Sequence, residues 1–159
     1  MNKEVCWVIT ATFFLAGCGS LSLPQPSSSA RDPSRYAYTR IACTADNESH
    51  FDTVTVDLAK VDAVPPALPF FVKASQASRA VFAAFEAGWG SQDLKGRKFH
   101  PAPAPQYVVY LDGLMSVTTS DGETRQFNSG DVLRVEDTAP CKGHISVVGD
   151  RPAYTLVVR

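Results

Sequence analysis

A series of short apolar runs, each closed by a turn signal, most restricts how this chain can fold. From residue 107 onward the runs are rich in β-branched, aromatic and aliphatic residues. Asp121-Gly122 favours a tight hairpin turn, and residues 128–131 (NSGD) form a second turn signal. Many short strands at this spacing predict an all-β sandwich or barrel. The predicted strands of this region are 107–111, 114–119, 124–127, 132–135, 145–148 and 154–158.

Two further strands are predicted upstream, at residues 36–43 and 51–58. The second alternates between apolar residues on one face and polar residues on the other, which is the two-residue period of a half-buried strand. Residues 74–87 are ambiguous, because their alanines suit a helix while the short span and the all-β surroundings favour a strand. We predict a strand there.

The first residues have the features of a targeting segment. Residues 5–17 are all apolar or small, a run shorter than the roughly 20 residues that cross a bilayer but suited to the core of a signal peptide. The run ends in Leu15-Ala16-Gly17-Cys18, which resembles the lipobox of bacterial lipoproteins. The resemblance implies a signal peptide at 1–17 and a lipid anchor on the thiol of Cys18. An ordinary cleaved signal peptide and a buried N-terminal helix are the alternatives.

A solvated tether and one folded domain are predicted after Cys18. Residues 18–35 are rich in Ser and Pro and contain little to bury, whereas 36–159 is long enough for one core. In a Gram-negative cell, Gly19 lacks the aspartate typical of inner-membrane retention, so we expect the periplasmic face of the outer membrane. The net charge is −1 and no long run of like charge occurs, which argues against a nucleic-acid partner.

Two cysteines, Cys43 and Cys141, remain in the predicted domain. Disulfides persist in exported proteins, so these two residues either pair or stay as separately buried thiols. The sequence leaves both alternatives open.

Several segments resemble the small single-domain members of the cupin superfamily. The resemblance covers most of residues 38–158, with order and turn positions in agreement, and implies a double-stranded β-helix, also called a jelly-roll barrel. Barrels of this superfamily often pair through edge strands, so a homodimer is left open. The segments are 46–51 (DNESHF), 99–103 (FHPAP), 106–113 (QYVVYLDG), 120–127 (SDGETRQF), 130–137 (GDVLRVED) and 142–144 (KGH).

The metal-binding motifs of that superfamily are only partly present. Counting back from Gly113, Gln106 stands at the usual glutamate position, Ala102 at the second histidine and His100 at the first. His144 matches the histidine of the second motif. A neutral carboxamide is a weak ligand for a divalent ion, because it lacks the charge of a carboxylate.

All three histidines of the chain, His50, His100 and His144, fall in these segments. If the fold brings them together, three imidazoles with Gln106 as a weak fourth ligand form a site for zinc, iron, manganese, nickel or copper. A polar pocket without metal and a purely structural role are the alternatives. Trp89 is either a ligand platform or a loop anchor. Four further aromatic residues are candidates for an apolar pocket or for the core: Phe82, Phe85, Tyr107 and Tyr110.

Three functions are therefore compatible with the sequence. The first is an envelope lipoprotein whose barrel binds a small molecule in a pocket lined by His50, His100, Gln106 and His144. The second is a metal-dependent enzyme of the dioxygenase or isomerase type, in which a divalent transition metal activates the substrate. The third is a non-catalytic structural protein of the envelope. No Ser-His-Asp order, phosphate loop or CxxC pattern supports other classes.

Overall fold

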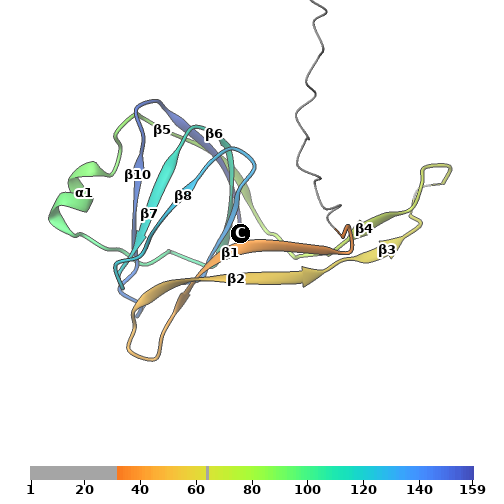
Figure 1. Ribbon diagram of the computed structural model, residues 1–159, viewed down its shortest axis with the longest axis horizontal. Helices are drawn as coiled ribbons and strands as arrows, with labels where there is room; N and C mark the ends of the chain where they lie inside the picture. The colour runs from red at the N-terminus through yellow and green to blue at the C-terminus, as the bar shows by residue number, and fades with distance from the viewer. Residues whose placement is uncertain (1–31, 64) are drawn as a thin grey trace, which may run out of the picture. The chain divides into compact units, whose positions relative to one another are not determined.

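The described part of the protein is built almost entirely of β-strands (Figure 1). The structure is a computed structural model that describes residues 32–63 and 65–159. The predicted signal peptide, the lipidation site Cys18 and residues 18–31 of the predicted tether lie outside the described residues. Within the described ranges, no helix has the length and apolar character needed to span a membrane.

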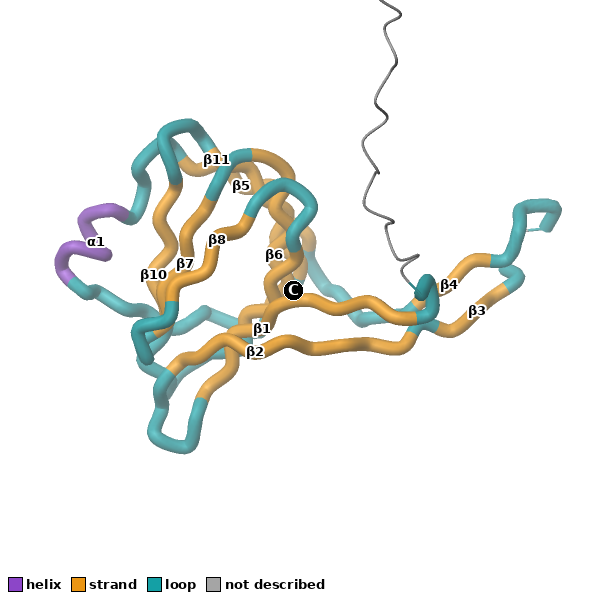
Figure 2. The backbone as a smooth tube through the Cα atoms, viewed as in Figure 1, coloured by secondary structure: helices purple, strands orange, loops and turns teal. Residues whose placement is uncertain are grey.

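Figure 2 shows the strands in orange and the short helix α1 in purple along the described backbone. The eight strands predicted in 36–43, 51–58 and from residue 107 onward are confirmed, with ends that move by two residues at most. Of the ambiguous stretch 74–87, only residues 80–85 form a strand. The elements are β1 (Arg35–Cys43), β2 (Ser49–Asp57), β3 (Ala59–Val61), β4 (Phe70–Val72), β5 (Ala80–Phe85), α1 (Ser91–Gly96), β6 (Gln106–Asp112), β7 (Met115–Thr119), β8 (Thr124–Phe127), β9 (Val132–Val135), β10 (His144–Val148) and β11 (Ala153–Val158).

The strands form three sheets. The largest has six strands in the order β2-β1-β9-β6-β11-β5, and the second has three in the order β10-β7-β8. Neighbouring strands are antiparallel except for β1 and β9, which are parallel. Strands β3 and β4 pair as a separate two-stranded sheet. The prediction of an all-β fold is confirmed, whereas β3, β4 and the short helix α1 were not predicted.

The hydrophobic core consists of side chains from both larger sheets. Ile41, Leu133 and Val135 come from the six-stranded sheet, while Met115 and Val117 come from the three-stranded one. Successive residues of a strand point to opposite faces, so a single period-two pattern in each strand supplies this core. The core therefore lies between the inner faces of the two sheets.

Aromatic rings close one part of this core. The ring of Phe127 stacks on Tyr110 with centroids 5.1 Å apart and contacts Phe51 at 6.1 Å. All three residues are at most 6% exposed. Offset contacts of this kind add to the stabilisation that burial of the rings provides.

Candidate functional site

A cavity of about 140 Å³ lies between the two larger sheets. Alternate residues of the strands line it, for example Val108 and Tyr110 of β6. Cavities of roughly 150 Å³ accommodate a molecule the size of benzene. The other lining residues are Phe85, Trp89, His100, Gln106, Met115, Leu133, Val135, His144, Ser146, Thr155 and Val157. The cavity therefore has the dimensions of a single-ring ligand.

The lining is mainly apolar and has little charge. Among the residues that the structure describes, none of the lining side chains is an Asp, Glu, Lys or Arg. Burial raises the pKa of the Tyr110 hydroxyl well above its usual range, so this group stays neutral. A cavity of this kind favours an uncharged ligand with few polar atoms.

His144 is the more buried of the two histidines in the lining. It is the first residue of β10, and its Nδ1 lies 2.8 Å from Oδ2 of Asp137, which is fully buried. A carboxylate only accepts hydrogen bonds, so an ionised Asp137 places the ring proton on Nδ1 and leaves a lone pair on Nε2. The ring of His144 lines the cavity, whereas Asp137 does not.

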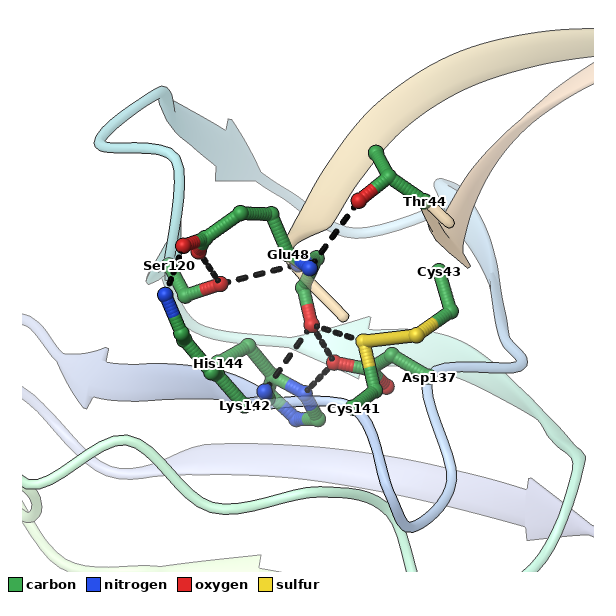
Figure 3. The surroundings of a disulfide bond; sticks show 10 residues. Cys43, Thr44, Glu48, Ser120, Asp137, Cys141, Lys142 and His144 are labelled. Carbon is green, nitrogen blue, oxygen red and sulfur yellow. Dashed lines mark hydrogen bonds and ion pairs between the residues drawn. A yellow bond between two sulfur atoms is a disulfide. The ribbon is translucent and has the colours of Figure 1, made fainter. Parts of the chain in front are cut away.

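Asp137 also accepts a hydrogen bond from the buried Ser49. The disulfide between Cys43 and Cys141 lies near Asp137 and His144 (Figure 3). The hydroxyl of Ser49 donates to Asp137 Oδ2 at 2.9 Å, accepts from the backbone N–H of Gly143 and lies 3.0 Å from Sγ of Cys141. Cys141 is joined to Cys43 with their Cα atoms 5.8 Å apart. Of the two alternatives left open for these cysteines, the structure has the disulfide.

His100 lies beside His144 at the more exposed side of the cavity. The two backbones exchange hydrogen bonds of 3.2 and 3.0 Å, and the two ring centroids are 5.2 Å apart. This close approach depends on Gly143, since a Cβ at that position would overlap the backbone carbonyl of His100. The structure thus brings together two of the three predicted histidines.

Gln106 lines the cavity, but its carboxamide oxygen has another partner. Gln106 Oε1 accepts a hydrogen bond of 2.8 Å from Nε of Arg159. The predicted weak ligand is therefore engaged at the edge of the cavity in an exposed hydrogen bond. In this arrangement the amide contributes to the wall of the site.

His50 is separated from the cavity, contrary to the prediction. In β2 the neighbours Ser49 and Phe51 are buried toward the core, so His50 lies on the opposite face. That face also carries Asp52, whose pKa is lowered by the Arg40 guanidinium. A shift of one position along a strand moves a side chain to the other face of the sheet. The sequence segment 46–51 therefore predicted the strand near His50 but not the face on which its side chain lies.

The described residues do not fit the predicted metal site. Two imidazoles remain in the cavity, and the oxygen of Gln106 is taken by Arg159. Across 32–63 and 65–159, no group of three His, Cys, Asp or Glu side chains is arranged to hold an ion. A transition metal bound in a protein has at least three protein ligands in the common catalytic sites, and this donor set supplies two.

Thr155 is a polar group of the cavity that the sequence analysis did not single out. The residue is 1% exposed and lines the cavity, and its Oγ1 has no hydrogen-bond partner. A change of register between β11 and β6 occurs at Tyr154 and Thr155, and such irregularities often redirect a side chain next to a functional site. A buried hydroxyl without a partner destabilises the empty protein. The oxygen is itself shielded from the cavity, so it reaches a ligand only after the side chain turns about χ1.

Two aromatic residues form the mouth of the cavity. The rings of Phe85 and Trp89 are 4.8 Å apart, both line the cavity, and Trp89 is 43% exposed. Of the other aromatic candidates, Tyr110 also lines the cavity. Phe82 is 78% exposed, and Tyr107 packs against Tyr38 outside this cavity, in the lining of a second pocket.

No protein-family model matches this sequence, and no curated protein matches it. The site therefore stands on its own geometry. The sequence analysis missed Asp137 and Thr155, although the two-residue alternation of inward positions marks both. Asp137 continues the inward face of Leu133 and Val135. Thr155 lies on the inward face between Ala153 and Val157. A polar residue at an inward position of an alternating strand marks a group that needs a partner.

Proposed function

We propose that this protein binds one small, uncharged molecule, about the size of a single ring, in the cavity between its two larger sheets. The observation that carries the proposal is the mainly apolar cavity of about 140 Å³ with His144, oriented by the buried Asp137, in its lining. Apolar walls supply affinity, and the few polar groups of the lining supply orientation. We therefore expect a ligand that has an apolar body and one polar end.

The proposed domain type is a cupin barrel, and the proposed location is the cell envelope. The resemblance of residues 38–158 to small cupins supports the first, since ligands of such folds lie inside the barrel. The run 5–17 followed by Cys18 supports the second. A lipid on Cys18 would hold the domain at the outer-membrane surface, with a homodimer as one arrangement there.

Lipidation of Cys18 is expected to be detectable directly. Cells that express the full chain and grow with radiolabelled palmitate should label the wild-type protein, whereas Cys18→Ser should take up no label. Cys6→Ser serves as the matched control, because it removes a thiol elsewhere in the predicted signal peptide and should remain labelled. Equal labelling of wild type and Cys18→Ser would contradict the proposed anchor.

Replacing Thr155 with valine is expected to stabilise the empty protein and weaken ligand binding. Valine has nearly the shape of threonine but no hydroxyl, so loss of the unpartnered group should raise the free energy of unfolding by about 1 kcal/mol. Phenol is the probe, with a Kd on the order of 1 mM or below. Loss of one hydrogen bond should raise that Kd by roughly tenfold.

Fluorescence of Trp89 measures the binding. In the full chain carrying Trp7→Phe, Trp89 is the only tryptophan, and it lines the cavity, so phenol should quench it to saturation. Thr53→Val is the matched control, because it makes the same change on an exposed position of β2 and should leave the Kd unchanged. An unaltered Kd in Thr155→Val, or quenching that never saturates, would refute the proposed site.

A further inference from the structure

His144 and Asp137 give the cavity a proton acceptor of fixed orientation, which binding alone does not require. We infer that His144 is a general base that removes a proton from an acidic C–H bond of the ligand, so that the protein catalyses a proton-transfer isomerisation or elimination. This inference rests on the proposed function, because the ligand must first enter the cavity. In this inference His144 is the base, and no step involves a metal ion.

The Asp137 carboxylate fixes the orientation of the His144 imidazole. Asp137 is fully buried, and its Oδ2 accepts from both the Ser49 hydroxyl and Nδ1 of His144. A buried carboxylate behind an imidazole fixes its tautomer and stabilises the imidazolium that forms when the ring takes a proton. Nε2 has no hydrogen-bond partner among the described residues, and the His144 ring lines the cavity, so we assign to this nitrogen the role of accepting that proton.

The surroundings of the pair suit a reaction in which charge develops on an oxygen. For a ligand with a C–H bond next to a carbonyl, Nε2 takes the proton, and the C–H electron pair forms the double bond of an enolate. Thr155, from the same lining, can donate its unpartnered hydroxyl to the enolate oxygen. The imidazolium then returns the proton to another carbon of the ligand, so atoms balance and no oxidant or reductant takes part.

His100 provides an internal control for this role. It lines the same cavity, with its ring centroid 5.2 Å from that of His144. Its ring makes no side-chain hydrogen bond within 32–63 and 65–159, and no carboxylate orients it. The inference therefore predicts that only one of the two neighbouring imidazoles is catalytic.

The ring opening of isoxazole, a single ring, to 3-hydroxyprop-2-enenitrile tests this role with the full chain. A base removes the C3 proton, the C–H electron pair completes the C≡N triple bond, the N–O bond breaks, and the enolate recovers a proton from the imidazolium. The wild-type protein should show a saturable rate that phenol inhibits. His144→Gln keeps a donor for Asp137 and should lower kcat/KM at least about 100-fold, the usual scale of general-base catalysis.

The companion variants separate chemistry from structure. His50→Gln, on the face of β2 opposite the cavity, should change kcat/KM by less than about 3-fold. His100→Gln should lower kcat/KM less than His144→Gln does, because His100 has no orienting carboxylate. Asp137 is a positioning residue, so Asp137→Asn should lower kcat by roughly 10- to 100-fold with KM unchanged. A purely structural role for Asp137 would instead raise KM and weaken phenol binding together.

Phenol binding keeps this inference distinct from the proposed function. Saturable phenol binding with a ring-opening rate equal in wild type and His144→Gln, or with no saturable rate, overturns the catalytic role and leaves the binding site intact. Absence of phenol binding overturns the binding site itself. Retained phenol binding in His144→Gln together with the loss of rate supports the inference.

Discussion

Replacing Gly143 with alanine is expected to destabilise the protein strongly. Gly143 has φ of +98°, and a Cβ there would overlap the backbone carbonyl of His100. The positive φ alone costs an alanine about 1 to 2 kcal/mol. The overlap with backbone adds to this, because no flexible side chain can move aside, and we expect a total loss of at least about 4 kcal/mol.

Gly122 offers a matched control for this substitution. It has the same φ of +98°, but a Cβ there meets nothing within 4 Å. Gly122→Ala should therefore cost only the backbone term of about 1 to 2 kcal/mol. Urea unfolding of both variants measures the difference, and equal losses would show that His100 does not lie against Gly143.

Removing the disulfide between Cys43 and Cys141 should produce the second large effect. The bond closes a loop with a sequence separation of 98 residues. In the chain-entropy account, a crosslink over such a loop stabilises the folded state by about 4 kcal/mol. The double variant Cys43→Ala/Cys141→Ala should lose this amount in urea unfolding, and dithiothreitol should lower the stability of the wild type but not of the variant.

A reagent that reacts with free thiols tests whether Cys43 and Cys141 are joined by a disulfide. Cys43 is exposed, while Cys141 is 3% exposed beside the Ser49 hydroxyl. Unfolded wild-type protein without reductant should show no reactive thiol at either position. Two free thiols, with no change of stability on adding dithiothreitol, would contradict the bond.

The strands could be predicted because their cause is local. Alternation of apolar and polar residues and the Asp121-Gly122 turn determine where β7 and β8 begin and end. The short β3 and β4 carry little periodicity, and α1 follows the left-handed Gly90 with no buried residue. Segments with so few residues and so little burial give a pattern too weak to read.

The site could be predicted only in part, because its geometry depends on contacts between distant strands. His100 and His144 were placed correctly in one cavity, and both depend on a backbone pairing that Gly143 permits. His50 was predicted to line the cavity, but it stands one position away from the inward residues Ser49 and Phe51 and therefore lies on the other face of β2. The pairing of Asp137 with His144 links residues seven positions apart across an irregular turn, which no local period determines.

A crystal structure of the protein grown with phenol tests the central claim most directly. The account predicts one phenol ring among Val108, Met115 and Val135, with its oxygen within hydrogen-bond distance of Thr155 Oγ1 or His144 Nε2. Hydrogen-bonded oxygens of this kind lie about 2.7 to 3.2 Å from their partners. An empty cavity at a phenol concentration that saturates Trp89 quenching, with phenol bound elsewhere on the protein, would contradict it.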